Sequence, residues 1–394
     1  MITRRNFIEM GAALVAGAGL RWRVSLGADE VAKSIAVPPA VPPHLKGCEK
    51  QFRVNPRQAA LDWFHDSRFG LMPCYYLASL DGRNCFEQFR FKIPVKDMEK
   101  KAARFTAAKF SAESICDLAV AAGMKYVSFV TKHCEGFCLW NTRQTTFNSV
   151  NSAAKRDLVG EMVTACNARG LGFFAFYEYG FDWHHPHGPR GKDFKTRITE
   201  VPYAQPEPSY AYGKDYDLNK YIDYAHAQIG ELLTNYGPIA GIWLDGVGVP
   251  LGGDRSKFRC QELYDKIHKL QPQALVSFKT GTTGTEDFYA PERQQLQNIK
   301  PGDPKPSELC EALNPSWSYV RGEKHRNADW VMQRLAFTRQ KQMNYLLGIG
   351  PRPDGSVVPA DVTTLKEVGR RIREHGWPQG VKELSAAKAE QEAF

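Results

Sequence analysis

The run Gly-Pro-Ile-Ala-Gly-Ile-Trp-Leu-Asp-Gly at residues 237–246 is an apolar, strand-like stretch that ends in a carboxylate. A residue directly after a buried parallel strand lies at the C-terminal edge of the sheet, where barrel proteins assemble their sites from several loops. The stretch therefore predicts Asp245 at the mouth of such a sheet. Asp-Gly after a strand is also a common turn signal, and a turn residue stays open as the alternative.

Polar and aromatic side chains follow other strand-like runs as well. The run 125–131 is followed by Lys132, His133 and Glu135, the run 171–177 by Glu178 and Tyr179, and the run 274–278 by the polar segment 287–293. Each such residue alone is also an ordinary capping or packing residue. Carboxylates, imidazoles and aromatic rings gathered on one rim are the lining that a sugar pocket requires.

From about residue 51 strand-like and helix-like segments alternate, which is the pattern of a parallel sheet with crossover helices. Strands are expected at 69–75, 125–131, 171–177, 241–244, 274–278 and 344–349, and helices at 111–122, 157–169, 218–236, 255–270, 329–342 and 360–375. We predict an α/β fold, a single (β/α)8 TIM-like barrel over residues 51–380, with two further strands in the irregular segments. The long segment 180–215 is expected to be functional because loops of that length are uncommon in compact domains.

The chain has 394 residues, 43% hydrophobic content and a net charge of +9, and several arginines fall within its first 23 residues. Without that segment the chain is only mildly basic. It contains no zinc-finger spacing and no nucleic-acid-binding motif, so no nucleic-acid partner is expected.

The nine cysteines include no Cys-x-x-Cys pair. Cys134 and Cys138 lie beside His133, a grouping that suggests a metal site. No second cluster of ligands completes a tetrahedral set, and free core thiols are therefore expected, with no metal and no cofactor.

The N-terminus is interpreted as an export signal. Thr-Arg-Arg-Asn-Phe-Ile at 3–8 and the short apolar run 11–20 resemble a twin-arginine signal over residues 1–28, which implies a periplasmic or secreted protein. An amphipathic first segment is the alternative. The apolar run is shorter than the roughly 20 residues that span a bilayer, so no membrane anchor is expected after signal removal. Residues 29–50 are predicted as a Pro-rich linker and 381–394 as a polar tail.

The chain resembles the α-L-fucosidases of glycoside hydrolase family 29. The resemblance is carried by Trp-Phe-His-Asp-Ser-Arg-Phe-Gly at 63–70, Thr-Lys-His-Cys-Glu-Gly-Phe-Cys-Leu-Trp at 131–140, Lys-Arg-Asp-Leu-Val at 155–159, the run 237–246, Pro291-Glu292, Glu-Leu-Cys at 308–310, Ser-Trp-Ser-Tyr at 316–319 and Asn-Tyr-Leu-Leu-Gly-Ile-Gly-Pro at 344–351. Because these runs are collinear from about residue 60 to 378, they are more specific together than any one motif is alone.

The resemblance implies a retaining mechanism in which Asp245 is the nucleophile and a second carboxyl group is the acid/base. Glu292 is assigned to that second role, with Glu308 and Glu178 as rivals. Sugar contacts carried over from matching positions are Glu87, His133, Tyr177 and Trp243.

The sequence also departs from the family pattern. Cys74 and Cys134 stand where the family has histidines, and Gln88 stands in the element that reads Glu-Trp-Tyr in the family. A thiol is a weak hydrogen-bonding group, so recognition of an axial hydroxyl is expected to be weakened or altered. The family's C-terminal β-sandwich has no counterpart after Trp377-Pro378.

Three hypotheses for function remain. The first is an exported retaining exo-glycosidase that removes terminal α-L-fucosyl or closely related residues from fucosylated or related glycans. The second is a catalytically weak carbohydrate-binding barrel. The third, a metal-dependent hydrolase that uses His133, His184, His185 and Asp245, has less support because the His-His pair lies on a loop without helical spacing.

Overall fold

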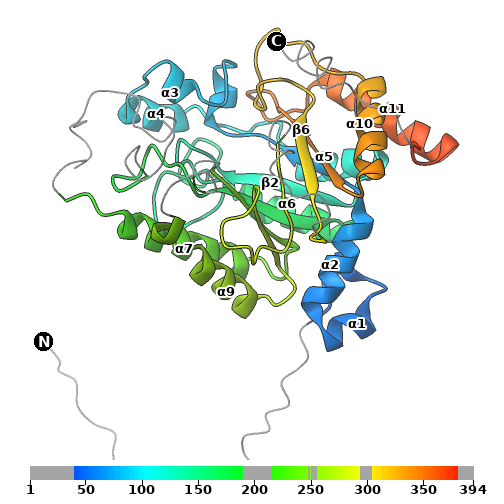
Figure 1. Cartoon of the computed structure of the whole chain (residues 1–394). Helices are drawn as coiled ribbons and strands as arrows, with labels where there is room; N and C mark the ends of the chain where they lie inside the picture. Colours follow the sequence, from blue (N-terminus) through cyan, green and yellow to red (C-terminus); the bar gives the residue numbers. More distant parts are fainter. Residues whose placement is uncertain (1–39, 190–214, 247–248, 250–254, 293–303, 380–394) are drawn as a thin grey trace, which may run out of the picture. The chain divides into compact units, whose positions relative to one another are not determined.

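The computed structural model describes residues 40–189, 215–246, 249, 255–292 and 304–379 (Figure 1). The predicted signal, half of the predicted linker, the polar tail and most of the long segment 180–215 lie outside the described residues. None of the described helices is long and apolar enough to cross a membrane.

Seven parallel strands form one sheet within the described residues, in the order β5-β4-β3-β2-β1-β7-β6. They are β1 (Phe69–Pro73), β2 (Tyr126–Lys132), β3 (Gly172–Glu178), β4 (Gly241–Asp245), β5 (Leu275–Phe278), β6 (Glu308–Ala312) and β7 (Asn344–Ile349). Six of them lie where the sequence predicts strands. The additional strand, β6, has the sequence Glu-Leu-Cys-Glu-Ala, and its two carboxylates hide the apolar pattern of a buried strand.

The segment 287–292 connects the two edge strands of this sheet. Single parallel bridges pair Ser277 of β5 with Phe288, and Glu292 with Cys310 of β6. Backbone hydrogen bonds from Ala290 N to Lys279 O and from Cys310 N to Pro291 O, 2.8 and 3.1 Å long, extend the same ladders. The segment thus occupies the eighth strand position, and the ring of strands is that of a (β/α)8-type barrel. The predicted fold class is confirmed.

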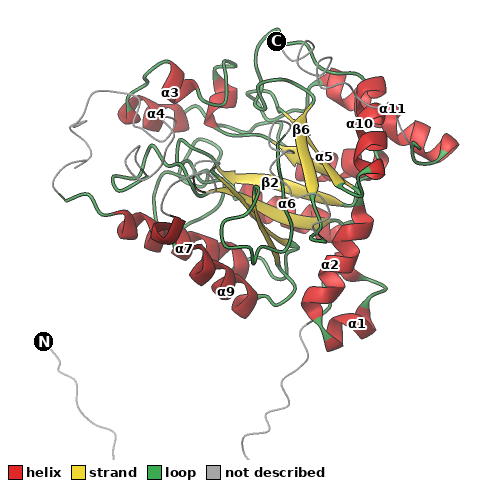
Figure 2. Ribbon diagram, viewed as in Figure 1, coloured by secondary structure: helices red, strands yellow, loops and turns green. Residues whose placement is uncertain are grey.

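Amphipathic helices surround the strands (Figure 2). They are α5 (Ala112–Ala121), α6 (Leu158–Ala168), α7 (Leu218–Thr234), α9 (Cys260–Leu270), α10 (Ala328–Gln340) and α11 (Pro359–His375), with shorter turns at η2 (Leu77–Leu80), α3 (Glu87–Arg90), α4 (Val95–Ala102) and η5 (Arg255–Phe258). Ser111, Asp157, Asp217 and Asn327 cap α5, α6, α7 and α10 by accepting a backbone N–H in the first turn.

The first described elements extend into the predicted linker. They are η1 (Pro43–Leu45), α1 (Glu49–Val54) and α2 (Pro56–Ser67). Leu45, Phe52 and Phe64 are buried in a cluster with Tyr126 and Phe174 from the first halves of β2 and β3. These elements therefore belong to the barrel unit and cover the N-terminal end of its strands, whereas the sequence analysis placed residues up to 50 in a linker.

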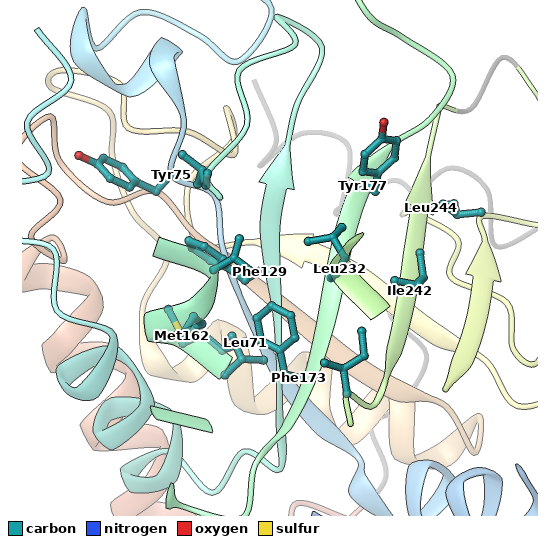
Figure 3. Close-up of a cluster of buried hydrophobic side chains, with 14 of the residues drawn as sticks. Leu71, Tyr75, Phe129, Met162, Phe173, Tyr177, Leu232, Ile242 and Leu244 are labelled. Atoms are coloured by element: carbon teal, nitrogen blue, oxygen red, sulfur yellow. The ribbon is translucent and has the colours of Figure 1, made fainter. Parts of the chain in front are cut away.

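Side chains of each strand alternate between the barrel interior and the helix layer. Phe173 and Tyr177 of β3 lie in the outer cluster with Ile242 of β4, together with Met162 of α6 and Leu232 of α7 (Figure 3). The intervening residues of the same strands, such as Phe176 and Trp243, belong to the inner cluster. This alternation decides which residues at the strand ends face the mouth of the barrel.

Gly369 of α11 offers a test of the helix layer. A Cβ at this position would collide with the carbonyl oxygen of Ala121 and come within 2.8 Å of Ala122 Cα. Because backbone cannot yield as a flexible side chain can, we expect Gly369→Ala to lower the free energy of unfolding by about 1–3 kcal/mol. In the control Gly230→Ala on α7, the new methyl group would meet only the end of the Lys266 side chain. That variant should be neutral or more stable, since alanine favours helix. Denaturant unfolding of both variants measures the difference, and equal stability would contradict the close packing of α11 on α5.

Candidate active site

Three charged side chains meet at the C-terminal ends of adjacent strand positions. Asp245 ends β4, Lys279 directly follows β5, and Glu292 ends the segment that completes the barrel. Lys279 Nζ lies 2.9 Å from Asp245 Oδ1 and also donates to Glu292 Oε1. The side chains of Asp245 and Glu292 are 19% and 37% exposed, against 1% for Lys279. One buried ammonium therefore holds two carboxylates that remain accessible to a ligand.

The position of Lys279 is set by the backbone and by an aromatic ring. Its φ of 49° is in the left-handed region, an uncommon conformation that turns the chain sharply after β5. Its Nζ lies 4.7 Å from the centre of the Trp243 ring, a cation–π contact. Burial alone would lower the pKa of Lys279, but the charges of Asp245 and Glu292 outweigh it and raise that pKa above the usual value. Lys279 is thus held in its charged form.

Glu178 is the residue of β3 that pairs in register with Asp245. Its Oε1 accepts hydrogen bonds from Gly180 N and Phe181 N, each 3.1 Å long. Burial raises the pKa of Glu178 well above the usual value, and the charge of Asp245 raises it further. Both effects favour the uncharged form of this carboxyl group, which lies next to the accessible carboxylate of Asp245.

Gly246 allows the two strand ends to lie this close. Its φ is 111°, and a Cβ on it would collide with the backbone of Gly180 and come within 2.9 Å of Glu178 Oε1. Only glycine therefore fits the space behind Asp245.

His133 and Cys134 follow β2 at the same end of the barrel. The His133 ring stacks on Tyr76 with a centroid separation of 4.3 Å, and its Nδ1 lies 3.4 Å from Glu135 Oε2. Cys134 Sγ lies 3.7 Å from Glu178 Oε2 and 4.0 Å from His133 Nε2. His133, Cys134 and Glu178 thus form a buried group whose atoms suit a metal ion as well as a hydrogen-bonding ligand.

Of the predicted sugar contacts, Trp243 lies in the barrel interior directly below this site. Its ring stacks on Phe176 at 5.2 Å, and its Nε1 donates to Glu308 Oε1 over 2.9 Å. Glu87 is buried and forms an ion pair with Lys101.

Tyr177 faces the opposite side of β3. Its hydroxyl donates to Gln228 Oε1 of α7 over 2.7 Å, and the Lys132 ammonium lies 4.5 Å from its ring centre. Figure 3 shows it among the side chains of the outer cluster. This placement does not support the predicted contact between Tyr177 and a sugar. Because side chains alternate between the two faces of a strand, the next residue, Glu178, is the one that β3 presents to the mouth.

Glu308, a rival for the acid/base role, begins β6 and bonds Tyr126 and Trp243 inside the barrel. Burial raises the pKa of Glu308 to about 7. Because Glu308 begins β6, it lies at the far end of that strand from the C-terminal rim. Of the carboxyl groups considered for the acid/base role, Glu292 and Glu178 are the two beside Asp245.

His184 and His185, named in the metal-hydrolase hypothesis, do not join His133. His184 Nε2 lies 3.0 Å from Glu99 Oε1, and its ring stacks on Phe147. The backbone N–H groups of His184 and His185 both donate to Asp182 Oδ1. The proposed set of three imidazoles around Asp245 is not assembled.

No role in the site was predicted for Lys279 from the sequence. Leu275 and Ser277 of β5 face the barrel interior, and the same two-residue alternation puts Lys279, directly after the strand, on that face. Because the strand was predicted, this alternation could have identified Lys279. A carboxylate pair at the mouth of a (β/α)8-type barrel, above buried aromatic rings, defines the class of barrel glycoside hydrolases.

Comparisons with known proteins agree with this class. A family described as alpha-L-fucosidase matches residues 48–377. The alpha-L-fucosidase isoenzyme 1 from Paenibacillus thiaminolyticus is 31% identical, with a TM-score of 0.71 over 84% of this chain and 80% of that chain. The alpha-L-fucosidase AlfC from Lactobacillus casei, solved in complex with alpha-L-fucose product, is 25% identical with a TM-score of 0.71 over 80% and 98%. The tissue alpha-L-fucosidase of Bos taurus is 26% identical over 385 residues, 87% of this chain and 74% of the relative.

The chain therefore belongs to the α-L-fucosidase family, glycoside hydrolase family 29, and is a glycoside hydrolase.

Proposed function

We propose that this protein is an exported, retaining exo-glycosidase that hydrolyses terminal α-L-fucosyl or closely related residues of glycans. The observation that carries the proposal is the pair of accessible carboxylates, Asp245 and Glu292, bound to one buried ammonium. Since both accept from the same nitrogen, their nearest oxygens are too close for the wide gap of about 6.5–9.5 Å that an inverting site needs between its carboxyl groups. A retaining pair at roughly 5–5.5 Å fits this arrangement.

In the proposed reaction Asp245 attacks the anomeric carbon and forms a covalent glycosyl-enzyme. Glu292 in its protonated form gives its proton to the leaving oxygen as the glycosidic bond breaks, and the resulting carboxylate then takes a proton from the water that hydrolyses the intermediate. Lys279 keeps the two carboxylates together and limits their repulsion. Trp243 supports this ammonium from below through its ring.

Two observations bear on which sugar the protein accepts. A variant of AlfC was solved with Fuca(1,6)GlcNAc, which supports a fucosylated glycan as substrate. Cys74 directly follows β1 and Cys134 lies just after β2, so two buried thiols lie at the same end of the barrel as Asp245. Weak hydrogen bonding by these thiols favours a sugar preference shifted from that of the family.

A panel of aryl glycosides that share one aglycone and differ only in the sugar tests the function. Release of the phenol from the α-L-fucoside, or from an analogue that differs from it at one hydroxyl, is the expected result. Binding of these sugars without cleavage would replace the proposal with a carbohydrate-binding barrel. Cleavage that depends on an added metal ion would replace it with a metal-dependent hydrolase.

Export is proposed on the strength of the two arginines and the short apolar run in residues 3–20, which lie outside the described residues. Periplasmic or secreted glycans would then be the accessible substrates.

Lys279→Gln tests the shared ammonium. Without the positive charge the two carboxylates repel each other, so their paired arrangement at the mouth of the barrel is less favourable. We expect kcat/KM to fall on the order of 10²-fold.

Lys279→Arg should restore part of the activity, because it keeps the charge. Lys109→Gln, which removes a surface ion pair with Asp354, is the control and should leave kcat/KM unchanged. A kcat/KM of Lys279→Gln that matches the unmodified protein would show that Lys279 only packs.

A further inference from the structure

A second chemical feature lies beside the carboxylate pair. We propose that His133 Nε2, Cys134 Sγ and a carboxylate oxygen of Glu178 bind a single divalent cation of the zinc class. Free thiols were expected here from the sequence, because no second cluster of ligands completes a tetrahedral set with Cys134, Cys138 and His133. The structure supplies a third ligand from the end of β3, which pairs with β2.

The spacing of the three ligand atoms fits a small cation. In a tetrahedral zinc site, sulfur, nitrogen and oxygen ligands at the usual bond lengths lie roughly 3.4–3.6 Å from one another. Here the thiol sulfur is 3.7 Å from Glu178 Oε2 and 4.0 Å from His133 Nε2, and all three ligand atoms lie within 4.8 Å of one another. A movement of about 1 Å or less in side chains would close the set. Three protein ligands leave a fourth position for water or a ligand.

Neighbouring groups lie where they would orient two of these ligands for coordination. His133 turns Nδ1 toward Glu135 Oε2 at 3.4 Å, and Glu135 Oε1 in turn accepts from Leu77 N over 3.2 Å. This leaves Nε2 directed at Cys134. Glu178 Oε1 is occupied by two backbone N–H groups, so that Oε2 is the oxygen turned toward the thiol. A carboxylate behind the distal nitrogen of a histidine and hydrogen bonds to a ligating carboxylate are the usual second layer of a metal site.

A hydrogen bond alone explains the group less well. The three residues are at most 7% exposed. The contact between Cys134 and Glu178 is long, and a thiol is a weak donor. Two backbone N–H groups stabilise Glu178 Oε1, but Oε2 faces the weak thiol donor, and the charged form of a carboxyl group buried beside Asp245 is unfavourable. A divalent cation reverses this balance by attracting both the thiolate and the carboxylate.

The experiment uses the full chain, which is stripped of metal with a chelator. One sample is then dialysed against zinc and a second sample against cobalt. One zinc ion per chain is expected. Cobalt should give a sulfur-to-metal charge-transfer absorption band in the near ultraviolet together with intense visible bands typical of a tetrahedral site. Cys134→Ser should lose the charge-transfer band and bind zinc at least about 10-fold more weakly. Glu135→Gln should weaken binding about 10- to 100-fold and keep the charge-transfer band, because it removes only the partner of His133.

Cys138→Ser is the matched control. Cys138 is equally buried and four residues away, but its sulfur contacts Gln228 on the helix side. This variant should bind both metals like the unmodified protein. The proposal is overturned if no stoichiometric zinc binds, if Cys134→Ser retains the band, or if Glu135→Gln binds as tightly as the unmodified protein. Because binding is measured without sugar, the result is independent of the proposed hydrolysis.

Discussion

Asp245→Gly is expected to reduce kcat on aryl glycosides by roughly 10⁴- to 10⁶-fold, the range seen when a covalent nucleophile is removed. The physical reason is that Asp245 is the carboxylate that ends β4 at the mouth of the barrel, where it is 19% exposed and held by Lys279. Without it no group is placed to form the glycosyl-enzyme. Added azide should restore activity in this variant and give a glycosyl azide of inverted configuration, because the small anion enters the space left by the carboxylate.

Thermal unfolding separates this loss from misfolding, because an unfolding temperature close to that of the unmodified protein shows that the variant is folded. Asp66→Gly, at an exposed position, is the control and should keep full turnover. Substantial activity of Asp245→Gly without azide would reject Asp245 as the nucleophile.

The fold was predictable because buried parallel strands have a simple sequence pattern. Six strands were found from apolar runs bounded by Gly, Pro or polar residues, and the helices between them from their caps. The eighth strand position was not predictable, because the segment 287–292 joins its neighbours through single bridges and contains polar residues. The carboxylates of β6 conceal its strand pattern in the same way.

The site was predicted in part for a related reason. Asp245 and His133 were located from the ends of their strands, and the structure places both at the C-terminal rim. Tyr177 was predicted as a sugar contact from a matching family position, and it lies one residue away from the inward-facing position of β3. Once Phe176 pairs with Trp243, the inner face must end in Glu178 and Asp245.

Long-range pairing was the remaining gap. The ion pairs of Lys279 join residues 34 and 13 positions apart, and the group of His133, Cys134 and Glu178 joins two strands. No sequence period encodes such contacts, since they arise only when the strands close into a ring.

Glu292→Ala is expected to divide substrates by their leaving groups. A substrate with a poor leaving group needs a proton on the departing oxygen, and its kcat/KM should fall about 10²- to 10⁴-fold. A substrate with a strongly activated phenol leaves without that proton and should show a much smaller loss in the step that forms the glycosyl-enzyme. Added azide should raise the turnover of the activated substrate in this variant, because azide attacks the intermediate without base assistance.

Glu178→Gln provides the decisive comparison, because Glu178 is the other carboxyl group beside Asp245 and its pKa is raised by burial and by that neighbouring charge. If Glu292 is the acid/base, Glu178→Gln should slow both classes of substrate to a similar extent. If the leaving-group dependence appears instead in Glu178→Gln and is absent from Glu292→Ala, the acid/base is Glu178. The geometry favours Glu292, since it is 37% exposed at the rim, while Glu178 is buried with one oxygen bonded to two backbone N–H groups. A proton donor must reach both the leaving oxygen and the incoming water, and an accessible carboxyl group that shares an ammonium with the nucleophile meets both requirements.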